Sequence, residues 1–489
     1  MTKNTGKYAL DLSAVPPPDI SPIIENLKGQ ANVVLKSALG TLPLVSFQTG
    51  GAGNFPYYYT DPAFLTFNYG TYNWINTNLL SNVPPIQQST GSNFTNLFLS
   101  AISKITYQLS TTDQALLNTA MSAAITYQMA LLTAWKSEYG SFPAGSSPLP
   151  IDNIMSTICA TWATPPTNLN AIQSSTNLHF LLNNAPASGQ TIMSAVAQYI
   201  NALGASVSLA NAVTMNNAYV AQALVALQSP AASNGGMITN NPNYTGYYPG
   251  YTFGISLPDI LNGLKATNNV IKIQMDVKVA SESEYSISIS GQTAFSIPFG
   301  DLFTVGVDGN ANYFHDEIVT NKNSVSIEMI FSGVTLVNYS PNDYNESTGE
   351  NWFYMAPVLD AIKNNNQDVS GYQFSPSPGI DFSDAGPFGI LQGVAISNYP
   401  DIVITVVSEN YQSIETTFKQ TVAMDISFLG ISLGGGSEST YSHSASSSIS
   451  TSTVTITLSA PPDMVAGRNT DSVGWILGVQ TNYPTLSIS

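Results

Sequence analysis

The stretch TTDQALLNTAMSAAITYQMALLTAWKSEYG, residues 111–140, is the clearest secondary-structure element in the sequence. Its apolar residues recur every three or four positions, which is the period of an α-helix that buries one side. They are Leu117, Ala120, Ala124, Leu131 and Trp135. Thr111 and Gln114 have the spacing of a capping box, and Gly140 follows the last periodic turn. The pattern predicts one long helix over residues 111–140.

The same stretch carries no charge from residue 114 to residue 135. This uncharged part is also long enough to span a membrane. Six amide and hydroxyl side chains make it too polar for constitutive insertion. They are Asn118, Thr119, Ser122, Thr126, Gln128 and Thr133. We therefore expect a helix buried within a bundle in preference to a transmembrane helix.

The chain has no Asp, Glu, Lys or Arg between Asp152 and Asp259. A segment without formal charge has little electrostatic repulsion to keep copies apart, so it must pack against protein or rely on surface amides and hydroxyls. Within it, residues 189–230 are rich in alanine and predict one or two helices. We expect Gly204 to break or bend them and Pro230 to end them.

The later part of the chain changes to a period of two. Residues 270–280, 324–331 and 402–408 read as strands, and residues 352–366 as a short inserted helix. A segment rich in Gly, Asn, Pro and Tyr, residues 234–254, marks the change. The predicted fold class is α+β, with a mainly helical, charge-poor N-terminal domain and a C-terminal antiparallel β-sandwich or elongated β-domain. The expected divisions are a helical domain over 1–235, a connector over 236–267 and a β-rich domain over 268–489.

Composition narrows the classes of partner. Only 9% of the 489 residues are charged, against roughly 25% in an average soluble domain. The net charge of −17 reflects a shortage of basic residues, 13 in all. This argues against nucleic-acid binding and against electrostatic docking to anionic lipids. Any membrane contact has to be apolar or specific for a headgroup.

The single cysteine, Cys159, allows no intramolecular disulfide and reads as a small buried apolar residue. The N-terminus has no continuous apolar segment behind its lysines, so it does not resemble a secretory signal. We expect synthesis in the cytoplasm, with release and action outside the cell left open.

Catalytic and zinc motifs are missing from the sequence. The three histidines, His179, His315 and His443, have neither HExxH spacing nor a neighbouring CxxC, and no GxSxG or P-loop occurs. We therefore predict a non-enzymatic protein without a cofactor.

The segment DGNANYFHDE, residues 308–317, is a candidate calcium loop, and NDYNESTGENW, residues 342–352, has the same character. The oxygen donors of the first segment fall on alternate positions, as in a calcium-binding loop. They are Asp308, Asn310, Asn312 and Asp316. Tyr313 stands where such a loop needs glycine, and Val319 stands where it needs a bidentate glutamate. A weak cation site and a solvated hairpin loop both remain open.

Residues 416–459 form the most unusual β-segment. Apolar residues alternate with polar ones on both sides of a glycine triplet, and residues 437–452 between them consist largely of serine and threonine. The residues assigned to this hairpin are Phe418, Val422, Met424, Ile426, Phe428, Gly434, Gly435, Gly436, Val454, Ile456 and Leu458. We predict two long strands, Thr416 to Leu433 and its return, which reverse at the glycines.

Two interpretations of this hairpin stay open. Amphipathic strands rich in Ser and Thr can form a β-pore, with a polar lumen on one side and lipid on the other. They can also be the outer strands of a sandwich, with their hydroxyls in solvent.

The C-terminal half resembles a loose group of β-rich bacterial and fungal proteins of unassigned function. The resemblance covers roughly residues 324–484, and its hairpin is faintly similar to that of aerolysin-type pore-forming proteins. It rests on Trp352 and Phe353, NYPDIVITVVS (398–408), SFLGISLGGGSES (427–439) with the YSHS that follows, SAPPDMVAG (459–467) and VGWILGVQTNYP (473–484). It implies a shared β-fold and no activity.

Three functional hypotheses follow. The first is a membrane-active, pore-forming-toxin-like oligomer, in which the β-domain positions the 416–459 hairpin and the helical domain mediates assembly or insertion. The second is a self-assembling structural protein, such as a filament, shell or intracellular crystal subunit. The third is a carbohydrate-binding protein, which rests on loops rich in Tyr and Asn, such as residues 50–74.

Overall fold

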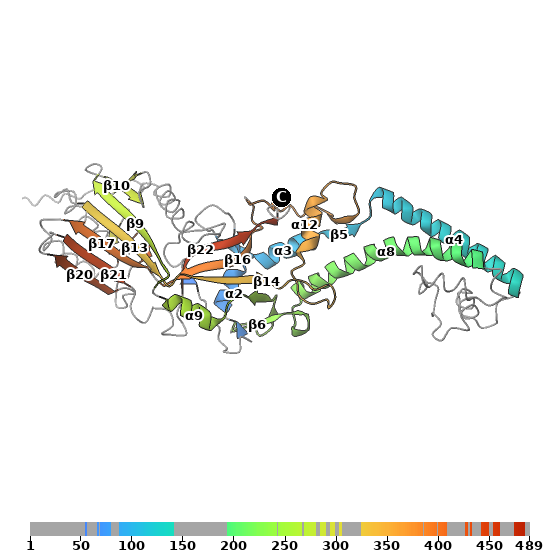
Figure 1. Cartoon of the computed structure of the whole chain (residues 1–489), viewed down its shortest axis with the longest axis horizontal. Coiled ribbons are helices and arrows are strands. Elements are labelled where there is room, and N and C mark those ends of the chain that lie inside the picture. The colour runs from blue at the N-terminus through green and yellow to red at the C-terminus, as the bar shows by residue number, and fades with distance from the viewer. Residues whose placement is uncertain are drawn as a thin grey trace, which may run out of the picture.

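The computed structural model is elongated, with a helical arm at one end, a β-sheet at the other and a mixed body between them (Figure 1). It confirms the α+β fold class, with helices mostly in the N-terminal half and strands mostly in the C-terminal half. The structure describes residues 54–55, 66–67, 69–79, 88–140, 193–279 without 242 and 267, 284–289, 294–298, 303–305, 324–407 without 385 and 399, 426–428, 431–432, 442–448, 453–459 and 474–484.

The arm consists of two long helices, α4 (Thr111–Tyr139) and α8 (Met193–Gln228), which run antiparallel side by side (Figure 1). The predicted helix over 111–140 is confirmed. Its N-cap is Ser110 in place of the expected Thr111, because the Ser110 hydroxyl accepts a hydrogen bond from the Asp113 amide. We expected a break or a bend at Gly204, and the break is wrong: α8 continues through it, since one helical glycine costs only about 1 kcal/mol relative to alanine.

Shorter elements build the body between the arm and the terminal sheet. Its helices are α2 (Tyr69–Ile75), α3 (Phe94–Ile102), the 3-10 turn η3 (Ala232–Asn234), α9 (Leu257–Lys265) and α12 (Met355–Lys363). A five-stranded antiparallel sheet follows the order β1 (Asn54–Phe55), β22 (Gly474–Asn482), β16 (Ile390–Ser397), β14 (Thr335–Pro341) and β8 (Tyr251–Phe253).

Three small sheets complete the body. They pair β5 (Ile105–Gln108) with β15 (Gly371–Phe374), β3 (Thr77–Leu79) with β4 (Gln88–Asn93), and β2 (Thr66–Phe67) with β6 (Met237–Thr239) and then β7 (Tyr247–Tyr248).

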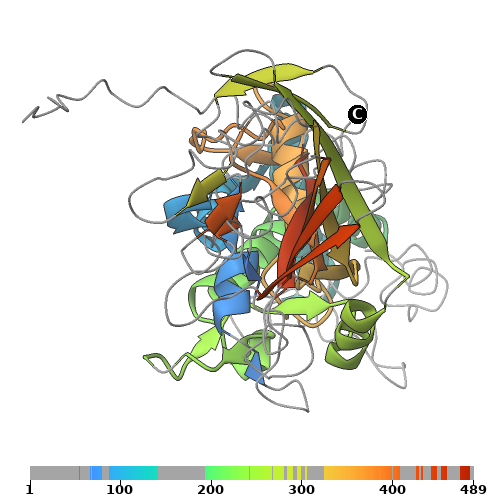
Figure 2. The ribbon, with the colours of Figure 1, turned by 90° about the vertical axis from the view of Figure 1, so that its left-hand side faces the viewer.

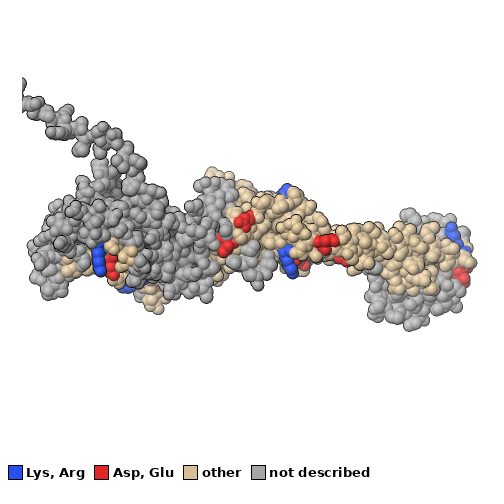
Figure 3. Space-filling view, turned by 90° about the horizontal axis from the view of Figure 1, so that it is seen from above, with Lys and Arg blue, Asp and Glu red and all other residues tan. Residues whose placement is uncertain are grey.

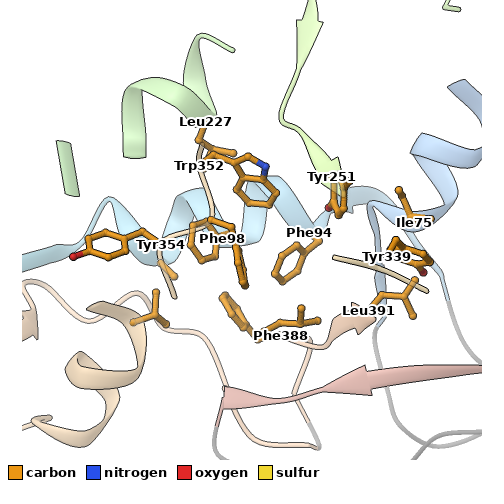
Figure 4. Close-up of a cluster of buried hydrophobic side chains, with 14 of the residues drawn as sticks. Ile75, Phe94, Phe98, Leu227, Tyr251, Tyr339, Trp352, Tyr354, Phe388 and Leu391 are labelled. Atoms are coloured by element: carbon orange, nitrogen blue, oxygen red, sulfur yellow. The ribbon is translucent and has the colours of Figure 1, made fainter. Parts of the chain in front are cut away.

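An aromatic cluster forms the core of the body (Figure 4). The ring of Phe98 lies beside four other aromatic rings, and its centroid is 5.1 to 6.3 Å from theirs. They are Phe94, Trp352, Phe353 and Phe388. The buried Trp352 indole donates a 2.7 Å hydrogen bond to the Gly250 carbonyl. The cluster joins residues on both sides of the divisions expected at 235 and 268. Those divisions stay a prediction, but one continuous core spans them.

The terminal sheet has seven strands and is nearest the viewer in the end-on view of Figure 2. Its order is β11 (Phe295–Pro298), β10 (Glu284–Ile289), β9 (Val270–Val279), β13 (Ser324–Ser332), β17 (Asp401–Val407), β21 (Thr453–Ser459) and β20 (Ser442–Ser448). Alternate residues of β9, such as Ile273 and Met275, are buried, whereas Lys272 and Gln274 between them are exposed. This period of two confirms the strands expected over 270–280, 324–331 and 402–408.

A bent two-stranded ribbon connects the two large sheets. β13 and β14 are nearly continuous, as are β16 and β17, and each strand of one pair bonds to the other pair. At the bend, Gly333 has φ +66°, and the Leu264 carbonyl oxygen lies 2.1 Å from the position of a β-carbon. The Asn398 amide donates to the same Leu264 carbonyl at 2.7 Å. The end of α9 therefore fastens the bend.

The predicted partner strands of the Ser/Thr-rich hairpin are wrong. β21 pairs with β20 on one side and with β17 on the other, so the hairpin spans 442–459 and β20 is the edge strand. Ile426 and Phe428, expected in the outgoing strand, lie in β18 (Ile426–Phe428). That strand pairs with β12 (Phe303–Val305) and β19 (Ile431–Ser432) in another sheet. The alternation of apolar and polar residues predicted the strands but not their partners, because a strand with one apolar face can pack equally well beside many other strands.

Replacing Gly333 tests the bend. We expect Gly333→Ala to lower the free energy of unfolding by about 1–2 kcal/mol for the positive φ, plus about 1–3 kcal/mol for the clash with Leu264. Urea denaturation followed by circular dichroism measures the loss. The matched control is Gly379→Ala, because Gly379 has φ +67° and open space where its β-carbon would be. Equal losses in the two variants would show that the close approach contributes nothing.

Candidate functional site: the helical arm

The arm is anchored in the body at the C-terminal end of α8. Val220, Ala223, Ala226 and Leu227 of that end belong to the aromatic core. Beside them, the Asn217 amide accepts from the Tyr107 backbone N–H at 2.9 Å and donates to the Tyr107 carbonyl at 3.2 Å. Asn217 thus occupies both backbone groups of a strand residue, so α8 has a fixed position against β5.

Two carboxylates hold the first turn of α4. Asp368 accepts hydrogen bonds from the Thr111 hydroxyl and, at 2.8 Å, from the Thr111 amide. The Ser370 hydroxyl donates to Asp113 in the same turn. Negative charge is favourable here, because the first amides of a helix lack partners and its dipole is positive. The hydrogen bonds from Thr111 lower the pKa of Asp368 below its ordinary value of 3.8.

A group of tyrosines fills the angle between the arm and the body. The Tyr372 hydroxyl donates to Asn216 of α8 at 3.1 Å, and the Tyr344 hydroxyl donates to Gln222 at 2.6 Å. Tyr354 donates to Glu346 at 2.5 Å. Burial, followed by that hydrogen bond, raises the pKa of Tyr354 far above its usual value, so its hydroxyl stays protonated as a donor. These bonds give the hydroxyls of Tyr344, Tyr354 and Tyr372 acceptors at the base of the arm.

Beyond its base, α4 has a buried seam along one side. Ala124, Leu131 and Trp135 are buried, with exposed fractions of 8%, 0% and 4%. Leu117 and Ala120, which were expected on this side, are half-buried. The predicted apolar side is therefore confirmed, although its first turns are only partly covered.

A second apolar stripe on α4 is exposed. Met121, Ile125 and Met129 are spaced four residues apart and so lie along one side of the helix. Their exposed fractions are 50%, 61% and 60%. Together with Leu116, Met215 and Val225, the arm carries more than half of the large exposed apolar side chains in the described structure.

The hydroxyl groups of α4 satisfy themselves on its own backbone. Between residues 114 and 135, every serine and threonine donates to the carbonyl four residues earlier, at 2.8 to 3.0 Å. They are Thr119, Ser122, Thr126 and Thr133. In α8, Thr214 and the amide of Asn216 do the same at 3.0 and 2.7 Å. Such back-bonding lets hydroxyls remain in a helix without a partner from water.

The arm surface has charges only near its ends (Figure 3). α8 has none in its 36 residues, and α4 has none between Asp113 and Lys136. Within the described part of the chain, α4 is the one helix with the length and apolarity to cross a membrane, and only 11% of its most apolar window is buried. The expectation that this helix is buried within a bundle is therefore wrong.

The sequence-predicted site residues are only partly described. Val454, Ile456 and Leu458 lie in β21, in register with Val406, Ile404 and Ile402 of β17. The other hairpin residues except Ile426 and Phe428 lie outside the described residues, as do all four calcium candidates, Asp308, Asn310, Asn312 and Asp316. Where the chain is described, no three His, Cys, Asp or Glu residues gather as metal ligands do.

Sequence reasoning missed the features that define the arm. It counted the hydroxyls of α4 against membrane contact, although each has a carbonyl four residues before it on the same helix. Asp368 gave no signal, because 257 residues separate it from Thr111.

Comparisons with known proteins place the chain in no group. No family model, no curated protein and no solved structure matches it.

The hydrogen bonds from Thr111 to Asp368 predict that the stability of the first α4 turn depends on pH. The folded pKa of Asp368 is depressed, so its stabilising contribution is present above the ordinary value of 3.8 and is lost as the pH falls through the folded value. We expect hydrogen exchange of the first α4 turn to show less protection in Asp368→Asn at pH 6. The difference from the unmodified protein should shrink as both are acidified.

Asp381→Asn is the matched control. Asp381 also accepts a backbone amide, from Ser383 at 2.9 Å, and its pKa is also lowered, but it is not bonded to α4. If Asp368→Asn and Asp381→Asn affect the first turn of α4 alike, the two carboxylates do not differ in holding the arm.

Proposed function

We propose that this is a non-enzymatic, membrane-active protein whose α4–α8 arm enters the apolar part of a lipid bilayer. The observation that carries the proposal is α4 itself, a helix that has no charge between Asp113 and Lys136, is mostly unburied there and has its hydroxyls back-bonded. At about 1.5 Å per residue, residues 114–135 span about 33 Å, against about 30 Å for a hydrocarbon core.

The energetic case rests on what the arm avoids and what it gains. No charged side chain between residues 114 and 135 has to leave water, and a charge at mid-membrane costs about 2.5–3.5 kcal/mol or more. Completing the burial of Leu116, Met121, Ile125 and Met129 gains roughly 1 kcal/mol for each half-exposed side chain. The amides of Asn118 and Gln128 oppose insertion, which favours several arms packing together so that these amides meet partners.

The proposal moves the membrane contact from the β-hairpin to the arm. β20 and β21 are paired within the seven-stranded sheet, and β21 is hydrogen-bonded on both sides. A role for this sheet as a scaffold needs no strand to detach. The resemblance of the hairpin to pore-forming proteins therefore supports membrane activity less directly than the arm does.

Dye release tests the proposal. The protein should release an encapsulated dye from phosphatidylcholine vesicles without any need for anionic lipid, because the chain has few basic residues to bind it. Ile125→Glu/Met129→Glu should lower the leakage rate at least tenfold, since two charges would have to enter the bilayer. Both positions are exposed, so circular dichroism should show a folded protein.

The control places the same two charges elsewhere. Leu336→Glu/Val407→Glu changes two exposed apolar residues of the sheets, at 37% and 48% exposure, and should leak dye at the unmodified rate. Equal loss in both variants, or no leakage by the unmodified chain with any vesicle, contradicts insertion of the arm.

Self-assembly is the second candidate, and the charge-free α8 favours it. Copies of a 36-residue helix without charges meet no like-charge repulsion when their arms approach. Without lipid, the protein should then form ordered polymers that electron microscopy detects, and Ile125→Glu/Met129→Glu should dissolve them. A chain that stays monomeric in light scattering at high concentration rejects this candidate.

A further inference from the structure

A cleft of about 230 Å³ opens on the body, apart from the arm. It lies where the ends of β14 and β22 meet the beginning of β16 and the first turns of α12. Its volume corresponds to roughly eight water molecules at ~30 Å³ each, which suits a small organic molecule. The cleft plays no part in the proposed membrane activity.

The floor and walls of the cleft are apolar, and its mouth is polar. Pro341, Phe353, Ile390 and Pro484 are buried at the floor, and Met355 and Leu359 of α12 are half-buried. The polar residues that line it are Ser340, Asp343, Gln392 and Asn482. Ligand sites commonly combine an apolar lining with a few polar groups that orient the ligand.

Among the described residues that line the cleft, Asp343 is the only ionisable one. Its side chain is exposed, and among the described residues its carboxylate has no hydrogen-bond donor or cation as a partner. Partial burial nevertheless raises its pKa above the ordinary 3.8. A carboxylate beside an apolar wall is stabilised by a positive charge that replaces part of its lost hydration.

The backbone holds Asp343 in place before any ligand arrives. It forms a β-bridge to Phe353, and the Asn351 side chain donates to the Asp343 carbonyl at 3.0 Å. On either side of the bridge, the Tyr344 amide donates to the Phe353 carbonyl at 3.0 Å and the Phe353 amide to the Asn342 carbonyl at 3.1 Å. The charged mouth and the aromatic floor thus have a fixed separation, which reduces the entropic cost of binding.

These features select the class of ligand. A metal ion would find a single carboxylate, with one hydroxyl and two amides, spread around a space much larger than itself. An anion would meet Asp343 and a chain of net charge −17. We propose that the cleft binds a small alkylammonium ion, with the ammonium at Asp343 and the alkyl body against Phe353, Met355 and Leu359.

Ligand-observed NMR titration tests the proposal with n-butylammonium chloride as the probe. Dissociation constants in the millimolar range are expected for so few atoms. Neutral 1-butanol and anionic butyrate should bind at least about tenfold more weakly, because they lack the charge-assisted bond. Binding should also weaken as acid protonates Asp343, beginning above the pH at which an ordinary aspartate titrates.

Three variants separate the contributions. Asp343→Asn should weaken n-butylammonium binding about tenfold, and Leu359→Trp should abolish it by filling the cleft. Asp276→Asn, a carboxylate of β9 outside the cleft, removes the same charge and should change nothing. Equal affinity for butylammonium and butanol overturns the proposal, as does unchanged binding by Asp343→Asn or no binding at about 10 mM probe. Dye release does not enter this test, so it fails or stands independently of the membrane activity.

Discussion

The arm depends on the aromatic core around Phe98 and Trp352. Two antiparallel helices bury too little surface to hold a position in space by themselves. α8 has a position because its last turns enter the core beside these rings, and α4 has one because it follows a strand that belongs to the same body. Once this anchor exists, the remaining length of both helices extends away from it without further support from the described residues.

That geometry explains the unusual composition of the arm. A helix that extends into water normally carries Lys and Glu on its outer side. Here hydroxyls and small residues take that place, and the hydroxyls return their hydrogen bonds to the backbone. Such a surface suits contact with lipid as well as contact with other arms, which is why the two proposals, membrane activity and self-assembly, rest on the same two helices. The features that favour burial of this surface, in lipid or against other arms, over exposure to water are the exposed methionines and Ile125, because their apolar side chains form no hydrogen bonds with water.

Local pattern was sufficient to predict the long, strongly periodic elements of this fold, and insufficient to predict its short elements or which elements are neighbours. The helix over 111–140 and the strands over 270–280, 324–331 and 402–408 have periods that a window of ten residues contains. The burial of α4 cannot be read from such a window, because it depends on which elements approach from elsewhere in the chain. The same limit applies to β21, whose apolar alternation fits β17 as well as it fits residues 416–433. Contacts such as Asp368 with Thr111 and Asn217 with Tyr107 join residues more than a hundred positions apart, so no local signal marks them.

The bent ribbon has a mechanical consequence. Because β13 continues into β14 and β16 into β17, tension on the seven-stranded sheet travels along covalent backbone into the strands that flank the aromatic core. At the same bend, the Asn398 side chain is hydrogen-bonded to the Leu264 carbonyl at the end of α9. A load applied at the far end of the seven-stranded sheet is therefore carried to the body by two backbone connections, and a helix contacts them where they turn.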